Sequence, residues 1–305
     1  MKLQNTLIIT FTSLILISFN IYADELSDKN AACNAALNKG DFNSAAKLAD
    51  EVLKRDTHNR EALICKGRLL GAQGSFDAAL ITLKQAETLS KAPFEHIIGN
   101  MLIGNVYKAQ QKYAEAITSY EAGLAVAKAD KNEKYIRANH NLIGDVQSRA
   151  QDYNAALASY QAGSKLAMND NERAESFELL AATYKALAQY EAAIEYQIKA
   201  VQMQKISGTL DQYAESNLAL GQMQIAAKDY ANADKTLAKF AQFAKDNGGA
   251  YYEAKANLYL AQSKAASGDA ASAKTLLADA RTLAKSVGAS DLNSAIDATE
   301  KKLNN

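Results

Sequence analysis

One motif recurs along the chain and limits the possible folds more than any other feature. The segment at 111–124, Gln-Lys-Tyr-Ala-Glu-Ala-Ile-Thr-Ser-Tyr-Glu-Ala-Gly-Leu, returns at 151–163 as Gln-Asp-Tyr-Asn-Ala-Ala-Leu-Ala-Ser-Tyr-Gln-Ala-Gly. Looser copies begin at Gly40, Gly74, Ala188, Lys228 and Gly268. Repetition of a unit of this size is typical of helical arrays, which act by presenting surface.

Three aligned positions define the repeat. We take as its anchor the aromatic that follows each turn: Phe42, Phe76, Tyr113, Tyr153, Tyr190 and Tyr230, with Ala270 in the seventh copy. The anchors are separated by 34, 37, 40, 37, 40 and 40 residues. Each copy has Ala three residues after the anchor and a small residue nine before it, namely Cys33, Gly67, Gly104, Gly144, Ala181, Gly221 and Ala261. Small residues let two helices cross closely, so we expect the aromatic anchors to fill the core beside the turn.

These positions carry a resemblance to a known family. Ile103-Gly104, Ile143-Gly144 and Leu220-Gly221 on the first helix, with Ala116/Tyr120 and Ala156/Tyr160 on the second, resemble tetratricopeptide repeats. The resemblance covers roughly residues 26–285, and the 40-residue units are similar to the long-repeat subgroup. Tryptophan and the usual closing proline are missing from the repeats. The resemblance implies an all-α, right-handed superhelical solenoid of about seven helix-turn-helix repeats.

The repeat also predicts the domain organisation. We expect turns near residues 41, 75, 112, 152, 189, 229 and 269, and a C-terminal capping helix over 290–303. Asp297, Glu300 and Lys301 make that last helix polar, as a terminal cap requires. Because no long linker interrupts the repeats, residues 24–305 are predicted to form one solenoid domain.

Residues 1–23 have the pattern of a secretory signal peptide. Lys2 precedes an apolar run from Leu7 to Phe19, and Ala23 precedes an acidic pair. We expect cleavage after Ala23 and export, with a bacterial periplasm as the compartment because cysteine-rich extracellular features are missing. Ile21 is bulkier than the small residue usual near a cleavage site, so an uncleaved anchor stays the alternative. No second apolar span follows, so we expect no stable membrane span after cleavage.

The two cysteines are expected to meet an oxidising compartment, where thiols usually pair. Cys33 lies nine residues before its anchor and Cys65 eleven before its own, on first helices of neighbouring units. Two residues correspond to about 200° around a helix, so the thiols lie on opposite sides of their helices. Neighbouring helices of a stack meet through opposite sides, which makes a disulfide feasible. The alternative is two buried, unpaired thiols.

Charge and motifs exclude several functions. The 34 basic residues balance 34 acidic residues, which argues against a nucleic-acid partner. His58, His96 and His140 are the only histidines, and none has a second metal ligand at a regular spacing. Phosphate-binding loops, nucleophile elbows and metalloprotease motifs are missing too. We therefore expect no enzyme activity, no cofactor and no metal site.

The face most suited to binding is that of the first helices, which line the inner wall in the family that the chain resembles. Positions eight and twelve residues before the anchors share one helical face. An Asn amide there can both donate to and accept from a peptide backbone, although a merely solvated face is the alternative. The Lys-then-Asn clamp for a carboxylate is not matched, because Asn30 is followed by Asn34. The candidate binding residues at these positions are Asn30, Asn34, Arg68, Asn105, Asn141 and Asp145, and Lys108 and Arg149 extend the same face.

Together these expectations describe an exported, non-enzymatic adaptor that binds another protein or a peptide segment in the concave groove of its superhelix. Envelope assembly is the setting suggested by analogy with periplasmic repeat proteins. The alternative is a periplasmic sensory or regulatory protein whose array closes on a small peptide or solute.

Overall fold

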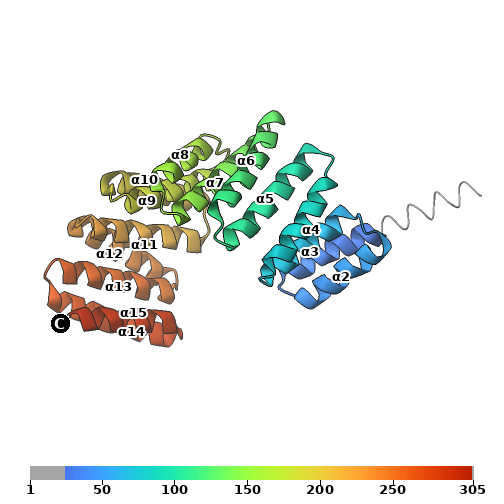
Figure 1. The fold of residues 1–305 in the computed structure, drawn as a ribbon. Coiled ribbons are helices and arrows are strands. Elements are labelled where there is room, and N and C mark those ends of the chain that lie inside the picture. The colour runs from blue at the N-terminus through green and yellow to red at the C-terminus, as the bar shows by residue number, and fades with distance from the viewer. Residues whose placement is uncertain (1–24, 304–305) are drawn as a thin grey trace, which may run out of the picture. The chain divides into compact units, whose positions relative to one another are not determined.

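In the computed structural model, residues 25–303 are described, and helices are the regular elements there (Figure 1). The expected signal peptide lies outside the described residues. The helices form seven pairs, each a first helix, a tight turn and a second helix, and α15 (Ser290–Leu303) follows the last pair. The all-α helical-repeat solenoid predicted from the sequence is therefore confirmed.

The bounds of the helices follow the repeat. The first helices are residues 25–38, α3 (Arg60–Ala72), α5 (Pro93–Ala109), α7 (Glu133–Arg149), α9 (Asp170–Ala186), α11 (Leu210–Ala226) and α13 (Ala250–Ala266). The second helices are α2 (Phe42–Arg55), α4 (Phe76–Thr88), α6 (Tyr113–Ala129), α8 (Tyr153–Ser164), α10 (Tyr190–Ser207), α12 (Tyr230–Asp246) and α14 (Ala270–Ser286). Each anchor is thus the first residue of its second helix.

The turn inside each pair has one backbone signature. The residue two before the anchor is left-handed in all seven pairs, with φ from 57° at Ala188 to 93° at Gly268. Glycine takes this conformation without the steric cost that a Cβ brings. Three pairs have glycine there, and the other four have Gln111, Gln151, Ala188 and Lys228. The aspartates at 41, 152, 229 and 269 then cap the second helices by accepting a backbone N–H three residues on.

Two positions of each second helix pack against the first helix, one predicted from the sequence and one, seven residues after the anchor, that the sequence analysis did not single out. The Ala three residues after each anchor is fully buried in all seven pairs. The six aromatic anchors are only half-buried. Phe42, Phe76 and Tyr113 pack against buried clusters without being part of them, so the anchors border the core and do not fill it. The space beside the small residue is instead filled by the side chain seven after the anchor, buried in every pair. A Cβ built on Gly67, Gly104 or Gly221 would overlap that side chain, which is Leu83, Tyr120 or Leu237.

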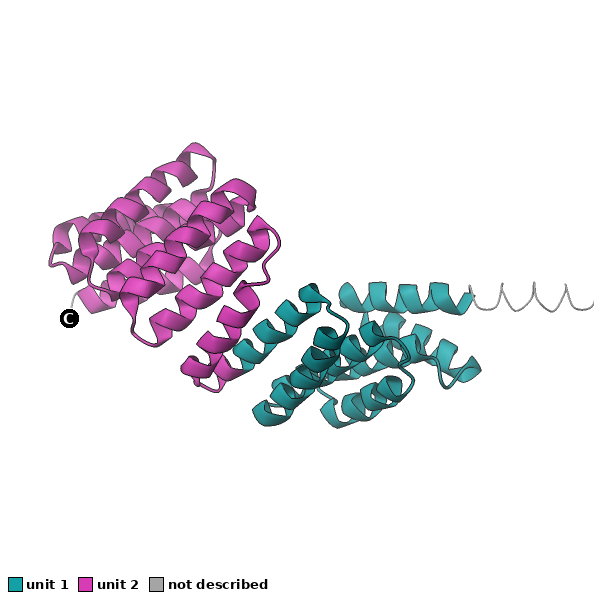
Figure 2. Cartoon of the chain, turned by 90° about the horizontal axis from the view of Figure 1, so that it is seen from above, with its two compact units in different colours: residues 1–146 teal, residues 147–305 magenta. Residues whose placement is uncertain are grey.

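The chain falls into two compact units, residues 1–146 and 147–305, with the boundary inside α7 (Figure 2). In the first unit, Leu83 and Tyr120 belong to the buried clusters. In the second, Leu237 and Leu277 do so. Among the described helices, none is both long enough and apolar enough to cross a membrane. The single domain over 24–305 stays a prediction.

Candidate interaction surface

In the first unit, the candidate binding residues connect first helices of successive repeats. The Arg68 guanidinium of α3 reaches the preceding first helix, where Nη1 donates to the Asn34 Oδ1 at 2.7 Å and Nη2 to the Asn38 Oδ1 at 2.9 Å. The Lys108 ammonium of α5 lies 2.9 Å from the Asp145 Oδ2 of α7. These side chains therefore lie on a shared face, where they hydrogen-bond or pair with the first helix of a neighbouring repeat.

The other four candidates have different surroundings. Asn105 is exposed, and its Oδ1 accepts a 2.7 Å hydrogen bond from the Tyr120 hydroxyl. Asn141 is half-buried and Arg149 exposed. Asn30 is buried, with an amide Nδ2 that donates to the Asn59 Oδ1 at 2.9 Å. Asn30 is therefore committed to holding α3 against the first helix, and a binding role for it stays a prediction.

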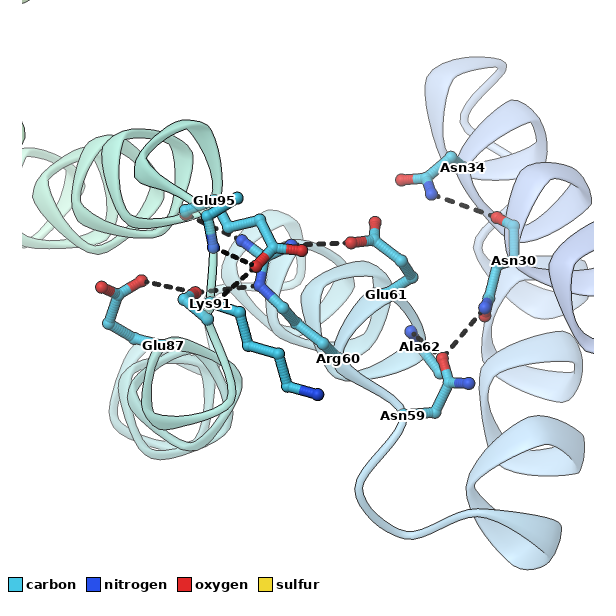
Figure 3. A network of polar contacts seen from close by, with 11 residues as sticks. Asn30, Asn34, Asn59, Arg60, Glu61, Ala62, Glu87, Lys91 and Glu95 are labelled. Carbon is cyan, nitrogen blue, oxygen red and sulfur yellow. Dashed lines mark hydrogen bonds and ion pairs between the residues drawn. The ribbon is translucent and has the colours of Figure 1, made fainter. Parts of the chain in front are cut away.

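Figure 3 shows how the polar contacts around Asn30 continue to the third repeat. The Asn59 Oδ1 also caps α3 by accepting the Ala62 N–H at 3.1 Å. Arg60, the next residue, donates from Nη2 to the Glu95 carbonyl at 2.8 Å and from Nε to the Ser90 Oγ at 2.9 Å. The start of α3 is thus hydrogen-bonded to the first helix of the preceding repeat, residues 25–38, and to the start of α5.

The second unit has a hollow on the same side of its first helices. It has a volume of about 540 Å³, lies between α9 and α11, and we call it the acidic hollow. Five carboxylates line it: Glu172, Glu175, Glu178, Asp211 and Glu215. At its base the Gln204 side chain is only 5% exposed, and Nε2 donates to the Glu178 Oε1 at 3.1 Å. The Gln204 Oε1 accepts no hydrogen bond from the described residues.

Neighbouring groups moderate the negative charge of the acidic hollow. The Lys255 ammonium of α13 lies 2.8 Å from the Glu215 Oε1. Burial lowers the pKa of Lys255, but the hydrogen bond and charge of Glu215 outweigh burial and leave that pKa raised. Burial and the 2.8 Å hydrogen bond to Asp211 raise the pKa of Tyr252 to about 12. The Tyr252 hydroxyl thus stays a neutral donor near pH 7.

The three histidines lie in different surroundings. The His96 Nδ1 lies 2.6 Å from the Glu87 Oε1, and the His58 Nδ1 lies 3.1 Å from the Thr57 Oγ1. His140 is half-buried on α7. Within residues 25–303, no group of three His, Cys, Asp or Glu side chains is placed to hold a metal ion.

Comparison with known proteins identifies the repeat. Two family models, each described as tetratricopeptide repeat, match residues 101–134 and residues 174–206. These segments fall on α5 with α6 and on α9 with α10, two of the helix pairs described above. The chain contains tetratricopeptide repeats.

Solved structures share this tetratricopeptide fold. The apo form of RapI is 14% identical, covers 92% of this chain and 82% of its own, and superposes with a TM-score of 0.72. A signal-transduction ATPase from Pyrococcus horikoshii with a tetratricopeptide repeat sensor is 16% identical over 84% of this chain and 41% of its own, at a TM-score of 0.64. PilW, a type IV pilus biogenesis factor, is 14% identical over 73% of this chain and 93% of its own, at a TM-score of 0.55. At such identities the likeness shows the fold alone. Comparison with curated proteins returns no match.

The first two tetratricopeptide units are joined covalently. The structure has a disulfide between Cys33 on the first helix and Cys65 on α3, 32 residues apart. Both residues are fully buried in the cluster that includes Leu37 and Leu69. The sequence analysis placed the two thiols on facing sides of neighbouring first helices, and the structure places them there.

The sequence analysis missed the acidic hollow, although the sequence contains a signal for it. Glu175 and Glu215 both lie fifteen residues before their anchors, and Lys255 holds the same position in the next unit. The rows compared there lay eight and twelve residues before each anchor, and Glu178 is the one lining residue of this hollow at those positions; it was not among the candidate binding residues. Extending the comparison by one helical turn would have revealed the acidic side chains.

Proposed function

We propose that this tetratricopeptide protein is an exported, non-enzymatic scaffold that holds a partner polypeptide on the face of its first helices. The observation that carries the proposal is the acidic hollow, a cavity on that face built from equivalent positions of successive repeats. It contains carboxylates, a buried amide and the hydroxyl of Tyr252 close by, which are groups that bind peptide donors.

The spacing of the repeats suits an extended partner. First helices packed together lie about 8–10 Å apart. An extended polypeptide advances about 3.3 Å per residue, so every third partner residue would meet a new repeat. The carboxylates of the acidic hollow favour Lys or Arg at such positions of the partner. The partner segment bound by the second unit is therefore basic.

Export is supported by two features of the first 65 residues. Residues 1–23 have the sequence pattern of a signal peptide, and the Cys33–Cys65 disulfide suits an oxidising compartment. We propose the bacterial periplasm as the location and envelope assembly as the setting. The mature protein should begin at Asp24, and N-terminal sequencing of native protein that starts at Met1 would contradict this.

A charge-reversed variant tests the binding face. Asn171 and Glu175 are exposed on α9, and both line the acidic hollow. Asn171→Lys with Glu175→Lys should abolish capture of the partner from envelope extracts, while the fold and melting temperature stay close to wild type. The matched control is Thr275→Lys with Asp279→Lys on α14, which makes the same charge change at exposed positions. If the first variant retains the partner, or if only small solutes raise the melting temperature, the scaffold proposal is wrong.

A further inference from the structure

The second unit also has a hollow on the opposite side of α11, which we call the α12 hollow. It has a volume of about 820 Å³ and lies between the end of α10, α11 and α12. On α11 it is lined by Tyr213, Asn217 and Leu220, whereas Asp211 and Glu215 line the acidic hollow. At about 100° per residue these two sets point to opposite sides of the helix. The α12 hollow therefore opens on the other side of α11, although Gln204 of α10 lines both hollows.

Aromatic rings form the wall of the α12 hollow. The ring of Tyr213 meets that of Phe243 edge-on, with centroids 5.2 Å apart, and lies 6.3 Å from that of Phe240. Phe240 is buried, while Tyr213 and Phe243 are half-buried and offer ring surface to the cavity. Leu210 lines the cavity with a side chain that is 49% exposed. Such a pocket suits a bulky apolar side chain.

The charge of the α12 hollow is positive. Lys205 and Lys239 line it, and none of its lining residues is acidic. Both lysines are exposed, and neither forms an ion pair with any residue of the described chain, 25–303. A lysine in the last turn of a helix, such as Lys205, also complements the helix dipole. The helix dipole therefore gives Lys205 a structural role, but it does not explain Lys239, which lies inside α12.

The same arrangement occurs one repeat earlier, in a hollow of about 610 Å³ between α8, α9 and α10. Lys165 and Lys199 occupy there the positions that Lys205 and Lys239 hold forty residues later. The Lys199 ammonium lies 4.8 Å from the centre of the Tyr196 ring and is paired with Glu195. No acidic residue lines this hollow either. On α10 this earlier hollow is lined by Tyr196 and Lys199, and the lining of the α12 hollow begins two residues later at Val201, so a single segment could reach both.

Exposed apolar side chains are concentrated in the part of the sequence that contributes to these hollows. Of the seven large apolar side chains that are exposed among the described residues, four lie between residues 168 and 210. They are Met168, Ile198, Ile206 and Leu210. Solvent-exposed apolar side chains beside an apolar cavity are typical of surfaces that bind partners.

We propose that the α12 hollow, with its counterpart on α8–α10, binds an acidic polypeptide segment carrying bulky apolar side chains. The apolar side chain enters against Tyr213 and Phe243, and flanking Asp or Glu carboxylates pair with Lys205 and Lys239. The charge requirement is opposite to that of the acidic hollow, so this surface selects a different segment. It goes beyond the proposed first-helix function and does not depend on it.

Selection from a phage-displayed library of random dodecapeptides tests the inference. The chain from Asp24 onward is the bait, and Lys205→Glu with Lys239→Glu is the counter-selection variant. Peptides specific to wild type should be enriched in Asp and Glu together with Phe, Leu, Ile or Trp. Their affinity for the variant should fall by about tenfold or more, since two attractive charge contacts become repulsive. The matched control, Lys235→Glu with Lys274→Glu, changes exposed lysines that line neither hollow and should leave affinity unchanged.

A second variant tests the apolar part without removing core packing. Thr236 lines the α12 hollow at the position that Tyr196 holds in the earlier one, so Thr236→Tyr should fold while filling the cavity. It should abolish peptide binding. The inference is wrong if the selected peptides lack acidic residues or bind the lysine variant equally well. It is also wrong if the surface instead holds a labelled fatty acid, or a second copy detected as a dimer that the lysine variant dissociates. Asn171→Lys with Glu175→Lys should not affect these peptides, which separates this test from that of the first-helix face.

Discussion

Replacing Gly104 of α5 with Ala tests the packing of a helix pair quantitatively. A Cβ at this position would lie 2.5, 2.7 and 2.9 Å from three ring carbons of Tyr120, against the 3.5–4.0 Å of an ordinary carbon contact. Tyr120 is fully buried, and its hydroxyl is held by the Asn105 Oδ1 at 2.7 Å. The ring therefore cannot turn aside without losing that bond. We expect the overlap to cost about 1–3 kcal/mol of unfolding free energy.

Gly71 of α3 provides the matched control. A Cβ there would lie 3.6 Å from the nearest atom, a methyl carbon of Val106, so Gly71→Ala adds a methyl group without overlap. Ala is favoured over Gly inside a helix by up to about 1 kcal/mol, and this gain applies to both substitutions. Gly71→Ala should therefore stabilise the first unit slightly. The unfolding free energy of Gly104→Ala should be about 1–3 kcal/mol lower than that of Gly71→Ala, and this difference isolates the packing contribution.

Urea unfolding of the two variants measures that difference, and hydrogen exchange of the α5 and α6 amides locates it. A double-mutant cycle adds a further check, because removing the ring with Tyr120→Ala removes the overlap. In that background Gly104→Ala should no longer destabilise. If Gly104→Ala is as stable as Gly71→Ala, the packing role assigned to the small residue is refuted.

Three further expectations concern the crosslink, a histidine and a turn. Changing Cys33 and Cys65 to Ser should lower the unfolding free energy by about 2–4 kcal/mol and speed exchange in the first helix, and an unchanged melting curve would contradict this. Burial, and then the charge of Lys128, lower the pKa of His140 below 6.5. Folded protein therefore binds this proton less readily than unfolded protein, so stability should fall as the pH drops below about 6.5, less so in His140→Asn. An NMR titration that places this pKa above 6.5 would refute the sign. Ala188→Gly should raise stability by about 0.5–1 kcal/mol, because glycine relieves the left-handed strain at φ 57°, and a fall would exclude strain at this turn.

The helix boundaries could be predicted from the sequence because the signals are local. Each anchor opens a second helix, and residues such as Asp41 and Asp152 cap it from within three residues. The role of the side chain seven after the anchor could not be found this way. It is Leu83, Tyr120 or Leu237 in different pairs, and these residues share only a position beside a small residue on another helix.

The candidate site was less predictable for the same reason. Asn30 and Asn34 appeared as free amides on a helical stripe, but their partners, Asn59 and Arg68, belong to the next repeat. The acidic hollow combines side chains of α9 and α11 with Gln204 at the end of α10. A periodic sequence indicates which residues share a helical face. Whether that face contains a hollow depends on how side chains from three different helices are placed around it.

Site-specific photo-crosslinking in the producing cells tests the central claim most directly. A benzophenone amino acid replaces Asn171 in the acidic hollow, or Lys274 on α14 as the control, both exposed. The account predicts a discrete polypeptide adduct from position 171 that is lost with Glu175→Lys, and none from position 274. An adduct from both positions, or from neither, would contradict binding on the face of the first helices.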